Sequence, residues 1–123
     1  MGIIKKFEDL LVWKKAHELV LKIYEQTRKF PSEEKFGLIS QMRRSAVSIA
    51  ANISEGFKRK SKKDKMNFYN IAQSSLSELK YYVILSKDLG YLGTEKEIEI
   101  LNKITGEVER MLVGLIKFVK HYT

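Results

Sequence analysis

The chain has 123 residues, of which 44% are hydrophobic and 31% charged, a balance typical of a globular protein rather than a disordered one. It contains no cysteine, which excludes disulfides, zinc–thiolate and iron–sulfur sites, and a cysteine nucleophile. Lysine and arginine number 23 against 15 aspartate and glutamate residues, a formal net charge of +8. No apolar run approaches the roughly 20 residues of a membrane span, and no signal peptide is recognisable, so we expect a cytoplasmic protein without a membrane segment.

The first half of the chain predicts two helices, over residues 8–29 and 33–58, because apolar residues recur there at alternating spacings of three and four. Glu8 and Asp9 favour the start of the first, since anions suit the positive end of a helix dipole. Gly37 is expected to disturb the first turn of the second. The predicted core lines are Trp13, Ala16, Val20, Ile23, Thr27 and Phe30, then Ile39, Met42, Ala46, Ile49 and Ile53.

The second half predicts helices over residues 62–89 and 94–121 by the same spacing. Gly90 suits the end of the third helix, because glycine tolerates the left-handed conformation found there. Thr94 and Glu97 form a capping-box pattern at the start of the fourth. The predicted core lines are Phe68, Ala72, Ser75, Leu79, Tyr82 and Leu89, then Ile98, Leu101, Thr105, Val108, Leu112, Leu115, Val119 and Tyr122, with Ile104, Met111 and Phe118 alongside.

Four helices joined by short connections predict an all-α fold, an antiparallel up-down-up-down four-helix bundle in one domain over residues 1–123. Each helix would be about 30 Å long or more at 1.5 Å per residue. In this topology, the connection between the second and third helices lies at the same end as both termini.

The positive charge is concentrated along one stretch. Residues 43–65 hold eight basic and two acidic residues, a net charge of +6, whereas the other 100 residues have a net charge of +2. The candidate nucleic-acid-binding residues are Arg43, Arg44, Lys58, Arg59, Lys60, Lys62, Lys63 and Lys65. The predicted topology also gathers ten basic and four acidic residues at the end with the termini, which we call the basic pole. Its cations are Lys5, Lys6, Lys58, Arg59, Lys60, Lys62, Lys63, Lys65, Lys117 and Lys120.

Two interpretations of the basic pole stay open, a solvated surface and a contact with a polyanion. Lys62, Lys63 and Lys65 fall in the first turn of the third helix, where each cation costs up to a few tenths of a kcal/mol against the dipole. A bound phosphate would relieve that cost. Phe57 and Phe68 are candidates to stack on bases, but packing in the core is the favoured role for both.

A line of polar residues runs beside the apolar line of residues 33–58 and contains Gln41, Ser45, Ser48, Asn52 and Glu55. Such a line must be solvated or paired, so a water-facing surface, a buried network and a seam against a second subunit are the alternatives. Structural or interface roles are expected for Gln41, Ser48, Asn52, Glu55 and Glu78.

The sequence offers little for catalysis. His17 and His121 lack a partner at metal-binding spacing, and no histidine is placed to activate the serines of residues 74–77. Glu55 and Glu78 are expected to form structural pairs, with Arg44 as a candidate partner, rather than to act as acid and base. We therefore predict no enzyme activity, no catalytic residue, no metal site and no cofactor.

Several motifs together resemble a known family. They are Leu11-Val12-Trp13-Lys14, Phe30-Pro31, Gly37-Leu38, Gln41, Arg44, the run Ser48-Ile49-Ala50-Ala51-Asn52-Ile53-Ser54-Glu55-Gly56, Arg59, Phe68, Ala72, Ser75-Leu76 and Glu78. The chain resembles the bacterial 23S rRNA intervening-sequence proteins, which are related to accessory variability proteins of diversity-generating retroelements. The resemblance implies a four-helix bundle, a homopentamer and no established enzyme activity. In retroelement relatives it implies association with nucleic acid and a reverse transcriptase.

The leading hypothesis is a non-enzymatic, oligomeric bundle that binds nucleic acid, RNA or a ribonucleoprotein, through the basic pole. The alternative is an oligomeric scaffold that binds another protein without touching nucleic acid. An enzyme with an unrecognised site is a third possibility and would need a deep pocket with convergent carboxylates.

Overall fold

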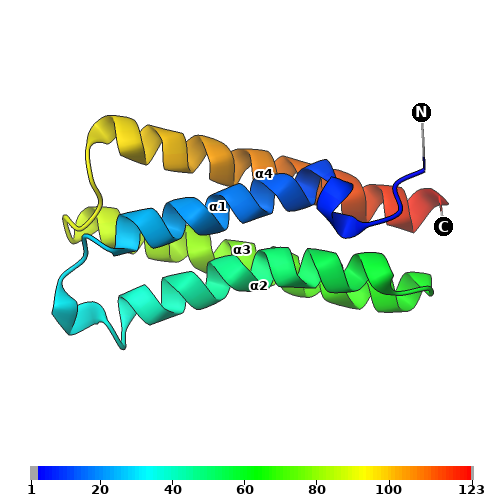
Figure 1. Cartoon of the computed structure of the whole chain (residues 1–123), viewed down its shortest axis with the longest axis horizontal. Helices are drawn as coiled ribbons and strands as arrows, with labels where there is room; N and C mark the ends of the chain where they lie inside the picture. The colour runs from blue at the N-terminus through cyan, green and yellow to red at the C-terminus, as the bar shows by residue number, and fades with distance from the viewer. Residues whose placement is uncertain (1–2, 123) are drawn as a thin grey trace.

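The computed structural model describes residues 3–122, which form four long helices and no strand. The helices are α1 (Leu11–Thr27), α2 (Leu38–Lys58), α3 (Lys62–Asp88) and α4 (Glu95–Tyr122). Successive helices run in opposite directions, and the α2–α3 connection lies at the same end as both termini (Figure 1). The all-α, up-down-up-down architecture predicted from the sequence is therefore confirmed. None of these helices is both long enough and apolar enough to cross a lipid bilayer, within the part of the chain that the structure describes.

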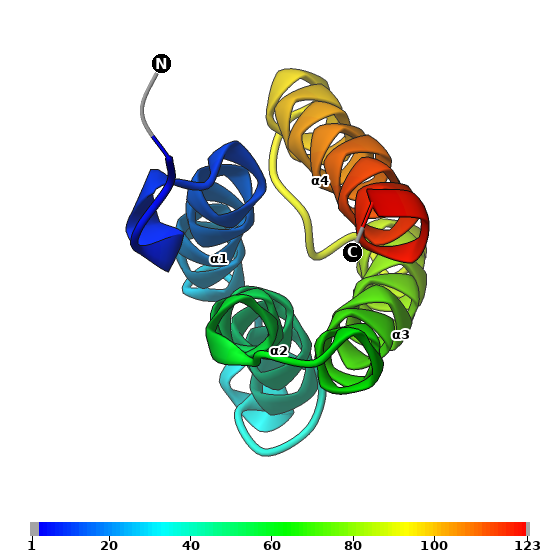
Figure 2. The ribbon, with the colours of Figure 1, turned by 90° about the vertical axis from the view of Figure 1, so that its right-hand side faces the viewer.

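The helices surround one core in chain order, as the view along their axes shows (Figure 2). Each helix packs against the helix before it and the helix after it, and α4 closes the circle against α1. The largest fully buried side chains come from all four helices. They are Tyr69, Leu19, Ile23, Met42, Ile49, Ile53, Leu76, Leu79, Leu101, Leu112 and Val108, with Thr27 among them.

Two of the helices begin later than predicted. Residues 7–9 form a short 3₁₀ turn, and Leu10 has an extended backbone, so α1 starts at Leu11 rather than at residue 8. Residues 32–34 form a second 3₁₀ turn, and α2 starts only after Gly37, whose φ of −111° and ψ of −109° are not helical. The acidic residues that favoured early starts occupy the 3₁₀ turns instead.

The core-facing side of α4 differs from the predicted line near its end. Ile116 and Val119 are buried, whereas Phe118 and Tyr122 are exposed and contact each other with their ring centroids 5.3 Å apart. A strict alternation of three and four residues drifts around a helix of 3.6 residues per turn. The buried line therefore takes a step of four from Leu112 to Ile116, so the predicted Leu115 is only half-buried and Tyr122 lies outside the core, whereas Val119 is buried as predicted.

The two helices of the α2–α3 hairpin approach closely at Gly56. The ring of Tyr69, which is buried, lies where a Cβ at Gly56 would be. Burial raises the pKa of the Tyr69 hydroxyl to about 12. This contact holds the last turn of α2 against the first turns of α3 and leaves three residues to connect the helices.

The opposite end of the bundle is closed by contacts of Glu97. Its carboxylate accepts hydrogen bonds from the Gln26 amide (2.6 Å) and the Lys29 ammonium (2.8 Å), so it ties α4 to the end of α1. It also accepts from the backbone N–H of Thr94, whose hydroxyl accepts from the N–H of Glu97, which confirms the predicted capping box. The bonds from Lys29 and Gln26 lower the pKa of Glu97 from 4.5 to about 2.

Gly90 ends α3 as predicted. Its φ is +77°, in the left-handed region that glycine adopts without strain. The N–H of Gly90 donates to the carbonyl of Lys87 and that of Tyr91 to the carbonyl of Ser86, the paired bonds of a Schellman motif.

The Gly56–Tyr69 contact predicts that Gly56→Ala destabilises the protein. Overlap of the new methyl with the buried ring costs about 1–3 kcal/mol, which exceeds the gain of up to about 1 kcal/mol in helix propensity. Gly114→Ala is the matched control, because nothing lies within 4 Å of its Cβ position, and it should stabilise the protein slightly. Urea unfolding followed by circular dichroism measures both, and equal effects of the two substitutions would contradict the packing argument.

The contacts of Glu97 predict a change in acid stability. Because folding lowers its pKa, the ionised carboxylate stabilises the fold above pH 4.5, and that contribution is lost as the pH falls toward about 2. Glu97→Gln should therefore lower the free energy of unfolding at neutral pH, and its difference from the wild type should shrink across this interval. Glu99→Gln, an exposed neighbour, is the control and should leave the pH profile unchanged.

Candidate nucleic-acid interface

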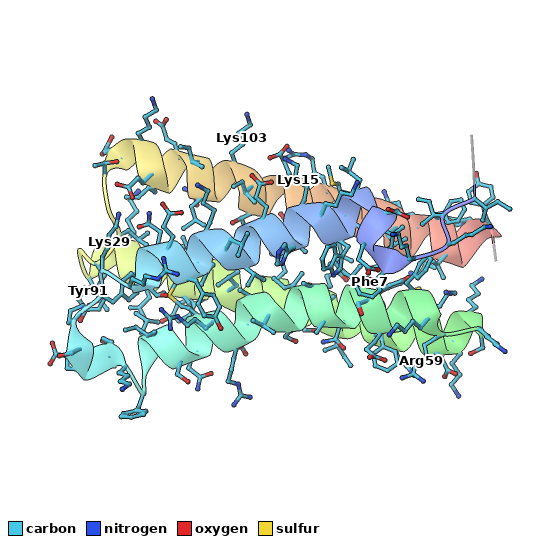
Figure 3. The ribbon with its side chains drawn as sticks, in the orientation of Figure 1. Phe7, Lys15, Lys29, Arg59, Tyr91 and Lys103 are labelled. Atoms are coloured by element: carbon cyan, nitrogen blue, oxygen red, sulfur yellow. The ribbon has the colours of Figure 1, made fainter. Side chains whose placement is uncertain are left out.

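The structure gathers six of the eight sequence-predicted nucleic-acid-binding residues at the α2–α3 connection. Lys58 ends α2, Lys62 begins α3, and residues 59–61 join them. Arg59 lies at this end of the bundle, close to the chain termini, whereas Lys29 and Tyr91 lie at the other (Figure 3). The other members of this group are Lys60, Lys63 and Lys65.

Two of these lysines make contacts that stabilise the fold. The Lys65 ammonium donates to the carbonyls of Gly56 (3.2 Å) and Phe57 (2.9 Å), which are at the C-terminal end of α2. The Lys62 ammonium donates to the carbonyl of Lys120 in the last turn of α4. Partial burial lowers the pKa of Lys65. The unfavourable position of these lysines in the first turn of α3 is thus offset by carbonyls of the two antiparallel neighbours, without any bound anion.

The remaining cations of the connection are more available to a partner. Arg59 pairs with Glu55 at 3.0 Å and covers the ring of Phe68, and Lys58 lies over the ring of Phe7. Lys60 and Lys63 are exposed, and their ammonium groups make no hydrogen bond or ion pair with any described residue. Of the cations at the connection, these two side chains are therefore the most available to bind a ligand.

Arg43 and Arg44 are placed apart from the connection. They are in the first third of α2, about 20 Å along the helix from Lys58 at 1.5 Å per residue. The Arg43 guanidinium donates to the hydroxyl of Thr27 (2.9 Å) and lies 4.4 Å from the centre of the Tyr24 ring, so it packs against α1. The arginine side chain at 44 is exposed. The structure therefore does not bring this pair together with the other predicted residues.

The polar line of α2 makes contacts with α3. The Ser48 hydroxyl is 2.7 Å from the Ser75 hydroxyl, and the Ser45 hydroxyl donates to a Glu78 carboxylate oxygen at 2.7 Å. Asn52 donates to the carbonyl of Ser48. Ser48, Asn52 and Ser75 thus form one half-buried group between the two helices, and Ser45 with the exposed Glu78 forms a separate contact.

Glu55 and Gln41 lie outside that group. Glu55 pairs with Arg59 along α2, and Gln41 is exposed. Within residues 3–122, Arg44 pairs with neither Glu55 nor Glu78. The predicted pairing of these carboxylates with Arg44 is therefore wrong. The Phe57 ring lies beneath Lys65 and the Phe68 ring beneath Arg59, and both are half-buried, so neither offers a free face.

The histidines lie on different helices, His17 on α1 and His121 on α4. His17 stacks on Trp13 with ring centroids 5.1 Å apart, and His121 is exposed in the last turn of α4. Among the described residues, no group of three or more histidine, aspartate or glutamate side chains is arranged to hold a metal ion.

One exposed aromatic side chain, that of Phe36, was not among the site residues predicted from the sequence. Phe36 is 88% exposed, in the turn before α2. It borders a shallow groove of about 750 Å³ that also contains Arg43 and Arg44. The signal that could have found it is an aromatic residue between Lys35 and Gly37, outside every predicted core line.

Fold and surface together define a small, basic four-helix-bundle protein with a cationic helix connection. A family model described as 23S rRNA-intervening sequence protein matches residues 8–114, and the chain belongs to this family. The resemblance inferred from sequence motifs is confirmed by this match.

The chain is also similar to a solved structure. This is a protein of unknown function from the S23 ribosomal protein family of Bacteroides thetaiotaomicron, which superposes with a TM-score of 0.78 at 30% sequence identity. The match covers 87% of this chain and 96% of the relative. A search of curated proteins found no match.

The two hydrogen bonds of Lys65 predict that Lys65→Met destabilises the fold by about 1 kcal/mol, because the carbonyls of Gly56 and Phe57 each lose a hydrogen bond, although that of Gly56 still accepts from the Arg59 N–H. Lys63→Met removes the same charge from an exposed, unpaired neighbour and should change stability by less than about 0.5 kcal/mol. Thermal and urea unfolding of both variants measure the difference. Equal losses would show that charge, rather than capping, is responsible.

Proposed function

We propose that this chain is a non-enzymatic RNA-binding bundle that contacts phosphates through its basic pole. The observation that carries the proposal is the α2–α3 connection, where Lys58, Lys60 and Lys63 are exposed at the end shared by both termini. A family named for the 23S rRNA intervening sequence supports RNA, rather than DNA, as the natural ligand.

The physical mechanism is release of counterions. Each lysine that neutralises a phosphate frees condensed cations, which makes the affinity fall steeply with salt concentration. One nearby acidic group, Glu55, is already paired with Arg59 and so competes less for the remaining lysines. Asp64 is the other acidic residue of the connection.

Self-association is part of the proposal, because several copies would multiply the phosphate contacts of one basic pole. The support is the outer face of α3, where Tyr81 and Ile84, three residues apart, are exposed. Apolar side chains grouped on one helix face often contact another protein. Size-exclusion chromatography with light scattering measures the subunit number directly.

The proposal predicts that the triple variant Lys58→Gln, Lys60→Gln and Lys63→Gln binds RNA more weakly than the wild type. The slope of log affinity against log salt should become shallower by up to about 2, since each lost phosphate contact contributes about 0.7 with a single strand. Fluorescence anisotropy of a labelled RNA between about 50 and 200 mM salt measures the slope.

A matched control distinguishes the effect of the basic pole on RNA affinity from the effect of net charge. Lys87, Lys96 and Lys103 are exposed, and the last projects from the half of α4 away from the pole (Figure 3). Changing these three to glutamine removes the same charge and should affect binding much less. Equal losses, or a wild-type affinity that salt does not alter, would refute the proposal. If one partner protein instead remains bound in stoichiometric amount after nuclease treatment, the protein-binding scaffold is favoured.

A further inference from the structure

The groove beside Phe36 has an aromatic ring held out toward solvent. A phenylalanine that is 88% exposed forgoes the favourable burial that such a side chain contributes elsewhere. The turn that carries Phe36 is nevertheless held by several hydrogen bonds. The N–H of Gly37 donates to the carbonyl of Glu34, and the Glu34 carboxylate accepts from the N–H of Leu38 and the hydroxyl of Tyr91. The ring is therefore presented by an ordered turn.

The groove runs along the outer face of α2. Small side chains such as Ser40, Ser48 and Ala51 are among its lining, and Phe36 borders it just before the start of the helix. A second hollow of about 260 Å³ shares Val47 and Ala51 with the first, so the two lie next to each other, and we call them together the track. The second hollow extends beside α1 to Phe7, over which Lys58 of the basic pole lies.

The track contains cations and rings but no carboxylate. None of the described residues that line either hollow is acidic, although the chain has 15 acidic residues. Lys35, Arg43 and Arg44 line the part near Phe36. Trp13 and His17, stacked on each other, line the part near the pole. A positive groove with aromatic rings at intervals is the surface that binds unpaired nucleic acid, because phosphates follow the cations and bases stack on the rings.

We propose that this track binds single-stranded RNA, with Phe36 as a stacking platform for one unpaired base and Arg44 as a phosphate contact. The inference rests on the proposed function and names its ligand class. It extends the bound strand from the basic pole along α2, whose 21 residues span about 30 Å. A duplex fits less well, since its bases are already stacked and its phosphates would not follow a shallow groove one helix long.

The test uses a labelled single-stranded RNA of roughly ten nucleotides and a duplex of the same length. The wild type should bind the single strand more tightly. Phe36→Ala should weaken single-strand binding roughly 5- to 100-fold, the effect of losing one stacked base, and leave duplex binding unchanged. The salt slope should stay as in the wild type, because no cation is removed.

Two further variants separate stacking from apolar contact. Phe36→Leu keeps an apolar side chain and should lose affinity as Phe36→Ala does, whereas Phe36→Trp should retain it. Leu21→Ala, which removes an exposed apolar side chain of α1 that lines neither hollow, should not affect binding. Because Phe36 is exposed, its variants should unfold at the wild-type denaturant concentration.

The outcomes distinguish this inference from the proposed function. If Phe36→Ala binds both RNAs like the wild type while the triple lysine variant is weakened, the track is refuted and the basic pole stands. If the wild type binds no RNA, both proposals fail. If Phe36→Ala instead dissociates an oligomer, or abolishes binding of an acidic helical peptide but not of RNA, the groove is a protein interface and the inference is overturned.

Discussion

The structure depends on the contact between the Tyr69 ring and the backbone of α2 at Gly56. The absence of a side chain at Gly56 lets a large buried ring of α3 lie directly against α2, one turn from the end of the hairpin. That approach leaves three connecting residues and brings Lys65 within reach of the carbonyls that end α2. The cationic surface is therefore a consequence of how two helices pack.

Antiparallel packing also divides the lysines of the connection into two classes. Lys62 and Lys65 begin α3, and they satisfy carbonyls at the ends of α4 and α2, where the partial charge of the helix is negative. Lys60 and Lys63 have no such partner among the described residues and face solvent. One run of lysines thus serves both stability and recognition, which explains why the charge is densest where three helix ends meet.

The periodicity of apolar residues predicted all four helices and their antiparallel order, because each helix buries one face and the connections are short. Gly37 was expected to disturb the predicted second helix, and α2 indeed starts after it, whereas the start of α1 was not predictable in the same way, since Leu10 leaves the helical conformation after a 3₁₀ turn. Arg43 was predicted as a nucleic-acid-binding residue together with the cations of the connection because it is near them in sequence, but the rise of α2 carries it to Thr27 of α1. Phe36 was missed because an apolar residue near a turn resembles a core residue until its exposure is known.

The stacked pair of Trp13 and His17 has a consequence for following this molecule in solution. The chain contains a single tryptophan, and its indole borders the hollow that continues from the groove of α2 toward the basic pole. Indole emission responds to the polarity and stacking of its surroundings. The protein therefore carries an intrinsic optical reporter at the junction of its two cationic surfaces, and occupancy there is readable without a label on either partner.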